Sequence, residues 1–182
     1  MIRISFVGDL MCSKEHINSI KKADATFDTI FSFANDKLTE SDFLVGNLES
    51  PVAGKDAGIT DHKWSFNSPI EFVQAIKKAG FNLVSLANNH CLDRGTDGVR
   101  ATVQALNDIK LDNLGINLSQ QSPKFKIYNI KDIKVGFLSY TYGTNYQVNQ
   151  VKLNKNNKNL VNIFNHQERI LKKMANWAKA NK

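Results

Sequence analysis

Short apolar runs alternate with amphipathic stretches along the first two thirds of the chain. Runs of mostly apolar residues that end in Gly or a polar group are typical of buried strands. Such runs occupy residues 2–7, 42–46, 81–86 and 113–116. Apolar residues spaced three and four positions apart predict amphipathic helices at residues 27–38, 69–79 and 96–109. This alternation of strand and helix predicts a parallel sheet with right-handed crossovers.

The pattern changes in the last third of the chain. Two apolar runs, at residues 125–130 and 133–139, flank a polar pair and predict a β-hairpin. Residues 141–160 are polar and rich in Asn, which is typical of a loop. An amphipathic helix is expected from about residue 161 to residue 180.

The composition is that of an ordinary globular domain. Of the 182 residues, 42% are hydrophobic and 23% are charged, which excludes a disordered chain, a collagen-like repeat and a small disulfide scaffold. No apolar run approaches the roughly 20 residues of a membrane span, and the N-terminus lacks the features of a signal peptide. We therefore expect a cytoplasmic chain as written, with a single domain over residues 1–182 and with Cys12 and Cys91 as reduced thiols.

Positive charge is concentrated towards the C-terminus. The formal net charge is +7, and residues 120–182 carry 12 Lys or Arg against two acidic residues. A basic region can bind an acidic polymer or a small phosphorylated substrate. Here the lysines are mixed with asparagines, most clearly at residues 152–159, which favours an ordinary solvated surface. We expect no nucleic acid partner and keep the acidic polymer or phosphorylated substrate as an alternative; the oligomeric state stays open.

Polar residues follow three of the predicted strands at the points where the strands end. Asp9 follows the first strand, Glu49 the second, and Asn89 and His90 the third. Because the carboxyl ends of parallel strands meet at one edge of a sheet, where ligands bind, we expect these side chains to converge on one pocket. Taken singly, each residue is also compatible with a turn or a helix cap, but their coincidence favours a site.

Two carboxylates, an amide oxygen and an imidazole are suitable ligands for a divalent metal. Oxygen ligands suit Mg²⁺ and Mn²⁺, and imidazole also suits Zn²⁺ and Fe. Asp9, Glu49 and Asn89 are therefore candidate metal ligands, and the carboxylates could bridge two metals about 3.5–4 Å apart. His90 and Asp93 are the candidate catalytic residues. Asp93 either accepts a hydrogen bond from His90 and fixes its tautomer or serves as a loop or cap residue before the next helix.

Four short motifs occur in order and span much of the chain. They are Gly8-Asp9-Leu10-Met11, Asn47-Leu48-Glu49-Ser50-Pro51, Phe66-Asn67-Ser68-Pro69 and Ala87-Asn88-Asn89-His90, with Asp93 and Gly95 after the last. Together they resemble the CapA-type proteins of bacterial capsule and poly-γ-glutamate synthesis, whose domain is similar to a calcineurin-type metallophosphoesterase. By this resemblance, Asp9 matches the first metal-binding Asp and Glu49 takes the place of the metal-bridging carboxylate. Asn89 then matches a metal ligand, and His90 a transition-state contact or acid.

The resemblance implies a fold and a function. The fold is α/β, a four-layer (α/β/β/α) metallophosphoesterase-like sandwich. This chain is expected to be its N-terminal part, incomplete at the C-terminus, because the family's later His-Trp-Gly-like and Gly-His-x-His-like segments have no counterpart here. The implied function is capsule polymer synthesis with a metal-dependent hydrolase site and no organic cofactor, in association with membrane-bound capsule machinery. The alternatives are a non-catalytic fragment or pseudoenzyme of that family, and a general metal-dependent phosphodiesterase.

The absent segments set expectations for the chain by itself. We expect weak binding of divalent cations, abolished by Glu49→Ala. The last helix is expected to pack Ile170, Leu171, Met174 and Trp177 on the sheet, beside an unpaired edge or gap. Because such an edge invites aggregation, we expect poor solubility or partial unfolding and little or no hydrolase activity.

Overall fold

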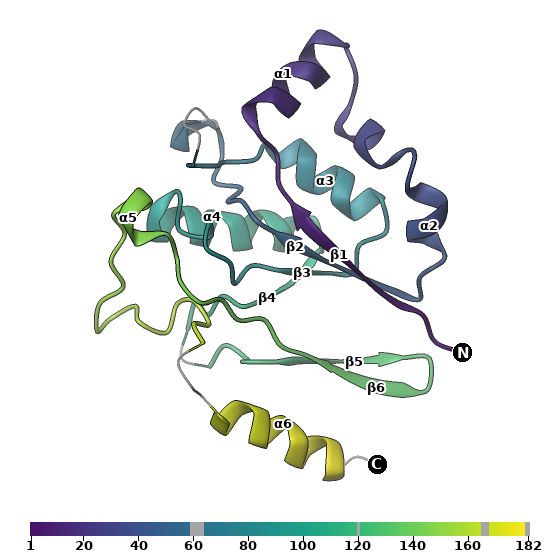
Figure 1. The fold of residues 1–182 in the computed structure, drawn as a ribbon, viewed down its shortest axis with the longest axis vertical. Coiled ribbons are helices and arrows are strands. Elements are labelled where there is room, and N and C mark those ends of the chain that lie inside the picture. The colour runs from purple at the N-terminus through teal and green to yellow at the C-terminus, as the bar shows by residue number, and fades with distance from the viewer. Residues whose placement is uncertain (59–63, 120, 165–167, 181–182) are drawn as a thin grey trace.

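Four parallel strands form the central sheet of the computed structural model, which describes residues 1–58, 64–119, 121–164 and 168–180. The strands are β1 (Ile4–Leu10), β2 (Phe43–Leu48), β3 (Leu83–Ser85) and β4 (Asp112–Leu114), and they lie side by side in chain order. All three pairings are parallel. The carboxyl ends of the strands therefore lie at one edge of the sheet, as the sequence pattern predicted (Figure 1).

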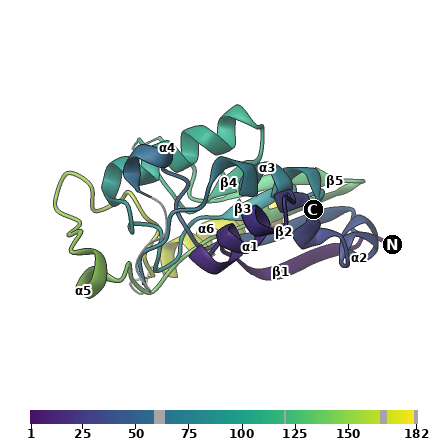
Figure 2. The same cartoon turned by 90° about the horizontal axis from the view of Figure 1, so that it is seen from above.

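Helices cover one face of this sheet (Figures 1 and 2). They are α1 (Lys14–Lys22), the 3₁₀ segment η1 (Phe27–Phe31) and α2 (Asn35–Thr39) after β1, η2 (Lys55–Ala57) and α3 (Ile70–Lys78) after β2, and α4 (Gly95–Asp108) after β3. Leu44 and Val84 of the sheet pack in one cluster with Ile76 of α3 and Leu106 of α4, and all four are buried. Gly80 follows the end of α3 with a φ of +95°, a left-handed conformation that is typical of the glycine after a helix.

A hairpin covers the opposite face of the sheet. It consists of β5 (Lys126–Ile130) and β6 (Ile133–Phe137), which pair antiparallel as predicted. Because successive side chains of a strand point to opposite faces, Leu44 of β2 packs against the helices while Phe43 and Val45 pack against the hairpin. The rings of Phe43 and Phe137 stack with their centroids 5.1 Å apart. A second core cluster thus joins the two sheets.

The helix α6 (Glu168–Ala180) lies beyond the hairpin (Figure 1). A Cβ at Gly136 of β6 would come within 2.9 Å of Met174 Cε, so this helix packs on the hairpin. The layers are helices, parallel sheet, hairpin and helix, which confirms the expected four-layer α/β fold. Met174 and Trp177 are half-buried, whereas the side chains of Ile170 and Leu171 lie outside the described ones. Within the described ranges, no helix is long and apolar enough to span a membrane.

β1 is the outermost strand on its side of the parallel sheet. In the described part of the chain it pairs with β2 alone, and the side chain of Phe6 is 68% exposed. The expected edge or gap beside the last helix is a different feature, because α6 packs on the hairpin, and it stays a prediction. Free backbone donors and acceptors at such an edge favour association between chains, so poor solubility stays a prediction.

The first strand is longer than predicted. It does not end at Gly8-Asp9 but continues to Leu10, with a register shift between Phe6 and Asp9. The irregularity lets the chain pass Gly8 and resume its pairing with β2. Asp9 is therefore held by the sheet itself and not by a turn after it.

The crossover from β1 to β2 also differs from the prediction. The single helix expected at residues 27–38 is replaced by η1 and α2, because Phe27 and Phe31 turn inwards to pack edge-on against rings of the core. The preceding helix α1 was not predicted, since its apolar residues are few. The side chain of Ser13 caps α1 by accepting a hydrogen bond from the His16 backbone N–H.

The last predicted helix begins later than expected, at Glu168. Val161 and Ile163 instead form isolated bridges with Ile116 and Thr141. Val161 is buried in a third core cluster with Leu160 beneath the end of the parallel sheet. The apolar residues that suggested an early helix start are therefore used as core residues in extended backbone.

Gly115, directly after β4, is expected to tolerate no side chain. Its φ is +110°, and a Cβ there would lie 2.6 Å from Ser139 Oγ and 2.7 Å from the backbone nitrogen of Ala87. Backbone strain and overpacking together predict that Gly115→Ala lowers the free energy of unfolding by about 3 kcal/mol. Gly143→Ala is the matched control, because a Cβ at Gly143 meets nothing within 4 Å. Urea unfolding of both variants measures the difference, and equal stability would refute this account of Gly115.

Candidate functional site

The ends of β1, β2 and β3 place the candidate residues at one edge of the sheet. Asp9 in β1 pairs with Asn47 in β2, and Asn47 pairs with Ser85 at the end of β3. Glu49 lies two residues beyond Asn47, and His90 follows β3 in a turn. The strand ends therefore meet as the sequence predicted, whereas the chemical roles of the residues stay predictions.

Asn47 joins the two acidic side chains. Its Nδ2 donates to Asp9 Oδ1 at 2.8 Å and to Glu49 Oε2 at 3.1 Å. One amide group thus holds two carboxyls from neighbouring chain segments side by side. No ion pair between described residues involves either carboxyl. No described Lys or Arg therefore forms an ion pair that would balance their charge.

The closeness of the two carboxyls moves their pKa values in opposite directions. Burial, a hydrogen bond with Asp9 and repulsion by the Asp9 carboxylate raise the pKa of Glu49 from 4.5 to about 7. The pKa of the exposed Asp9 is lowered, first by the hydrogen bond from Asn47. A carboxyl pair that holds on to one proton is also a place where a metal cation can replace the proton.

Removing the charge of Asp9 is expected to lower the pKa of Glu49. Folded Glu49 holds its proton more tightly than an unfolded Glu, so this group costs stability as the pH rises from 4.5 to about 7. Asp9→Asn should reduce this loss of stability, because the Asp9 carboxylate no longer repels the Glu49 carboxylate. NMR titration of the Glu49 carboxyl carbon measures the pKa, and Asp56→Asn, on the exposed η2, is the control. An unchanged pKa in Asp9→Asn would show that the two carboxyls do not interact.

Asn88 extends this amide chain to the third strand end. Its Nδ2 donates to Asn47 Oδ1 at 3.2 Å and to the Leu48 carbonyl at 2.8 Å, and its Oδ1 accepts from the His90 backbone N–H at 3.2 Å. Asn88 is buried, so these bonds satisfy polar atoms whose isolation would cost free energy. Asn88 therefore fixes the turn that carries His90 relative to the carboxyl pair.

The ring of His90 is buried and oriented by its neighbours. Its Nδ1 lies 2.8 Å from Asp93 Oδ2, and that oxygen also accepts from the Phe66 backbone N–H at 2.9 Å. The Phe66 ring packs edge-on against the imidazole, with a centroid separation of 4.7 Å. Because a carboxylate can only accept, Nδ1 donates and Nε2 is left as the acceptor, which faces Asn145 Nδ2 at 3.5 Å. This geometry suits a proton carrier whose tautomer is fixed by an acid.

Asp93 does not cap α4. The N-cap position belongs to Arg94, and no side-chain bond caps the helix. Of the two roles considered for Asp93, the contact with His90 is therefore the one that the geometry favours. The Asp93 side chain is fully buried, and its Oδ1 has no hydrogen-bond partner among the described residues. Such a costly placement is typical of a functional site.

The structure does not bring Asn89 into this network. Its side chain makes no hydrogen bond with a described residue and lines a neighbouring cleft formed with residues 141–147. Among the residues that the structure describes, no three His, Cys, Asp or Glu side chains lie close enough together to hold a metal ion. Asp9 and Glu49 are therefore a partial donor set: two carboxylates that suit a hard cation but do not enclose it.

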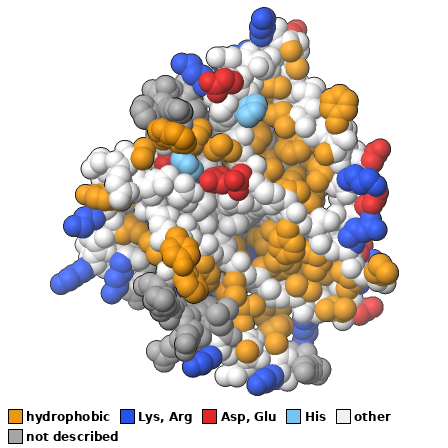
Figure 3. All heavy atoms as spheres, in the orientation of Figure 1, with side chains coloured by type: hydrophobic (Ala, Val, Ile, Leu, Met, Phe, Trp, Pro, Cys, Tyr) orange, Lys and Arg blue, Asp and Glu red, His pale blue; other side chains and the backbone are white. Residues whose placement is uncertain are grey.

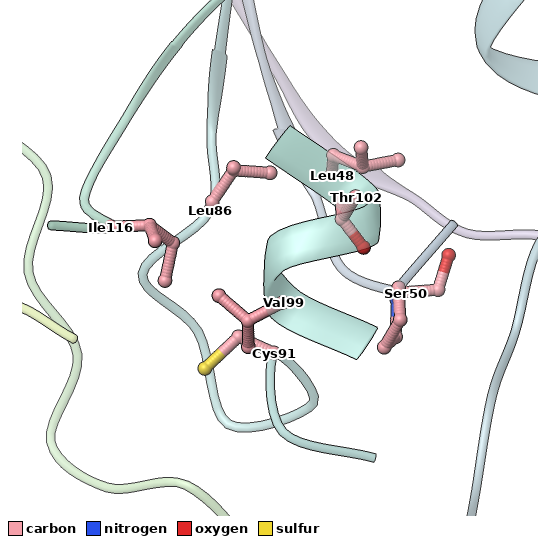
Figure 4. A pocket seen from close by; sticks show the side chains of 8 residues that line it. Leu48, Ser50, Leu86, Cys91, Val99, Thr102 and Ile116 are labelled. Carbon is pink, nitrogen blue, oxygen red and sulfur yellow. The ribbon is translucent and has the colours of Figure 1, made fainter. Parts of the chain in front are cut away.

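Cys91 follows His90 but points into the core. Figure 4 shows its side chain in a small cavity that Leu86, Val99 and Ile116 also line. The cavity has a volume of about 10 Å³, which leaves room for no more than a single water. Burial raises the pKa of the Cys91 thiol to about 12, and that of Cys12 likewise. Both residues are free cysteines, as expected, and they have no reactive thiolate at neutral pH.

Four residues of the site were given no role from the sequence. They are Asn47, Asn88, Phe66 and Asn145. The first three lie inside the motifs. There the sequence alone does not distinguish a side chain that faces the pocket from one that holds its neighbours in place. Asn145 is 55 positions from His90, and only the fold brings the two together. On the face shown in Figure 3, acidic and histidine side chains lie next to each other beside a broad hydrophobic area.

Comparison with known proteins places the chain in a family. The family model for "Bacterial capsule synthesis protein PGA_cap" matches residues 3–182. "Capsule biosynthesis protein CapA" of Bacillus anthracis is 31% identical over 144 residues, which are 77% of this chain and 34% of that protein. "PGA biosynthesis protein CapA" of Bacillus subtilis (strain 168) is 28% identical over 146 residues, 78% of this chain and 37% of that protein. The chain thus spans about a third of the length of these curated relatives. It belongs to the PGA_cap family of bacterial capsule synthesis proteins.

Proposed function

We propose that this chain carries a metal-dependent hydrolase site for capsule polymer synthesis, with a polymer of the poly-γ-glutamate type. The observation that supports this best is the pair of carboxyls joined by Asn47, next to a histidine whose Nδ1 is held by Asp93. Membership of a capsule synthesis family supplies the biological setting. A carboxyl pair without a cationic partner and an acid-oriented imidazole are what a metal-assisted hydrolase needs.

Each residue has a distinct part in this proposal. Asp9 and Glu49 would hold the divalent cation, of the Mn²⁺, Mg²⁺, Zn²⁺ or Fe type. When bound, the cation would polarise the bond under attack and lower the pKa of a water molecule. His90 takes or delivers a proton at Nε2, because its Nδ1 proton is held by Asp93. Phe66 packs on the imidazole ring and keeps water away from it.

A non-catalytic member of the family is the second candidate. The observation that favours it is the partial donor set, since no three metal-binding side chains of the usual kinds gather in the described part of the chain. Such a protein would keep the fold and bind cations weakly without turnover.

Hydrolysis assays separate the two candidates. The purified chain is incubated with Mn²⁺, Mg²⁺ or Zn²⁺ and with poly-γ-glutamate or bis(p-nitrophenyl) phosphate as substrate. Under the hydrolase proposal, His90→Gln lowers the metal-dependent rate at least about 100-fold, and His16→Gln, an exposed histidine of α1, leaves it unchanged. A folded wild-type chain without turnover of either substrate would favour the non-catalytic candidate. Turnover of the phosphodiester alone would point to a general phosphodiesterase.

A further inference from the structure

A cleft next to the candidate site is lined by amides, hydroxyls and two tyrosines. It lies between Asn89 and the segment of residues 141–147. Its volume is about 640 Å³, which is within the range of small-molecule binding sites. At one point of its wall, Asn145 Nδ2 lies 3.5 Å from His90 Nε2. The cleft therefore borders the candidate hydrolase site.

The segment that forms the outer wall is fixed to the body of the protein. The Thr141 backbone N–H donates to the Asn162 carbonyl at 2.9 Å, and the Phe164 N–H donates to the Thr141 carbonyl at 2.7 Å. Thr141 Oγ1 donates to the Gly143 carbonyl at 2.9 Å. The Tyr142 ring lies 6.1 Å from the Phe164 ring, measured between centroids. The wall is therefore largely organised before any ligand arrives, which reduces the entropic cost of binding.

Two tyrosine rings of this wall face solvent. Tyr142 is 89% exposed and Tyr146 is 46% exposed. An exposed tyrosine offers a flat apolar ring for stacking and a hydroxyl that stays hydrated, which is why tyrosines are enriched at binding surfaces. Two of them within five residues of chain give the cleft a stacking surface that the core does not use.

The polar groups of the cleft are neutral. The side chains of Asn89 and Gln147 make no hydrogen bond with a described residue, and each amide offers both donors and an acceptor. The lining residues include no Lys, Arg, Asp or Glu. A polyanion would call for cationic side chains with charge-assisted hydrogen bonds. Sugar hydroxyls both donate and accept, and the C–H face of a sugar ring stacks on an aromatic ring, so a neutral glycan matches this lining.

We propose that the cleft binds a neutral, hydroxyl-rich glycan segment, which stacks on Tyr142 and Tyr146 and hydrogen-bonds to Asn89 and Gln147. The proposal goes beyond the proposed function, because it concerns a separate binding cleft beside the proposed hydrolase site and not the polymer on which that site acts. The binding itself needs no cation, because the lining carries no charge.

Calorimetry with defined oligomers tests the proposal on the full chain. The probes are maltohexaose, cellohexaose and hexa-N-acetylchitohexaose, with hexa-γ-glutamate as the anionic counterpart. At least one neutral probe should bind saturably with or without Mn²⁺. Tyr142→Ala and Tyr146→Ala should each weaken that binding about tenfold or more. Phe33→Ala is the matched control, because Phe33 is a fully exposed aromatic residue outside the cleft.

Any of three results would overturn the proposal. The first is the absence of saturable binding by all three neutral probes to a chain whose circular dichroism shows it folded. The second is binding of a neutral probe that both tyrosine variants leave intact, and the third is binding of hexa-γ-glutamate alone. Glu49→Gln separates this proposal from the hydrolase function: it should remove cation binding and turnover while leaving the affinity for the neutral probe unchanged.

Discussion

Asp93→Ala is expected to lower the free energy of unfolding by about 3 kcal/mol, a large part of the 5–15 kcal/mol that stabilises a typical domain. The Asp93 carboxylate is fully buried and accepts from both the Phe66 N–H and His90 Nδ1. Without it, two buried donors lose their acceptor, at about 1–3 kcal/mol each. The substitution also removes a buried charge from the core, which offsets part of this loss of stability. Chemical denaturation followed by circular dichroism measures the change.

A conservative variant and a neighbour refine this test. Asp93→Asn keeps the volume and one acceptor, so it should cost less than Asp93→Ala. Its amide oxygen can accept from both the Phe66 N–H and His90 Nδ1 in the place of Oδ2, so the proton of His90 should stay on Nδ1, which nitrogen-15 NMR of the ring detects. Asp97→Ala, an exposed position in the first turn of α4, should cost no more than about 1 kcal/mol. If Asp93→Ala proved as mild as Asp97→Ala, the ring of His90 would not depend on this contact.

Glu49→Gln is expected to weaken Mn²⁺ binding by more than about 100-fold. Loss of a group that only supports a metal ligand costs about 10–100-fold, and Glu49 is proposed as a ligand itself. Gln keeps the shape of the side chain and can still accept the hydrogen bond from Asn47, so the fold should not change. Thermal unfolding with and without Mn²⁺ reports the effect, since a cation that binds the folded state raises its stability by mass action.

The control for this experiment is Glu71→Gln. Glu71 is an exposed glutamate in the first turn of α3. The Glu71→Gln variant should show a Mn²⁺-induced rise in melting temperature as large as that of the wild type. Binding by the wild type is itself expected to be weak, because the donor set is partial. A Glu49→Gln protein that kept the full rise would show that Glu49 does not bind the cation.

The parallel sheet and the edge that carries the candidate site could be predicted because their signals are local. Leu44, Val45 and Val84 lie in short runs of mostly apolar residues, which are typical of strands buried on both faces. Once the strands are known to be parallel, Asp9, Glu49 and His90 must come to one edge of the sheet. The hairpin was equally visible, since two apolar runs flank a polar pair.

The contacts within the site could not be predicted, because they depend on tertiary geometry. The sequence places Asn88 and Asn89 side by side, but the fold turns Asn88 into the amide chain and Asn89 towards the cleft. It gives no indication that Asn145 reaches His90 across 55 positions. The prediction of one helix from residue 27 was wrong for a related reason. Phe27 and Phe31 pack on rings of the core, and this packing outweighs the helical spacing of the apolar residues.

We propose that a divalent cation binds between Asp9 and Glu49, within reach of His90. Paramagnetic NMR tests it most directly, because Mn²⁺ broadens the signals of nuclei close to it. At substoichiometric Mn²⁺, the side-chain amide of Asn47 and the backbone signals of Asp9, Glu49 and His90 should broaden first, and this selectivity should vanish in Glu49→Gln. Broadening that spares these residues, or that persists unchanged in Glu49→Gln, would contradict the claim.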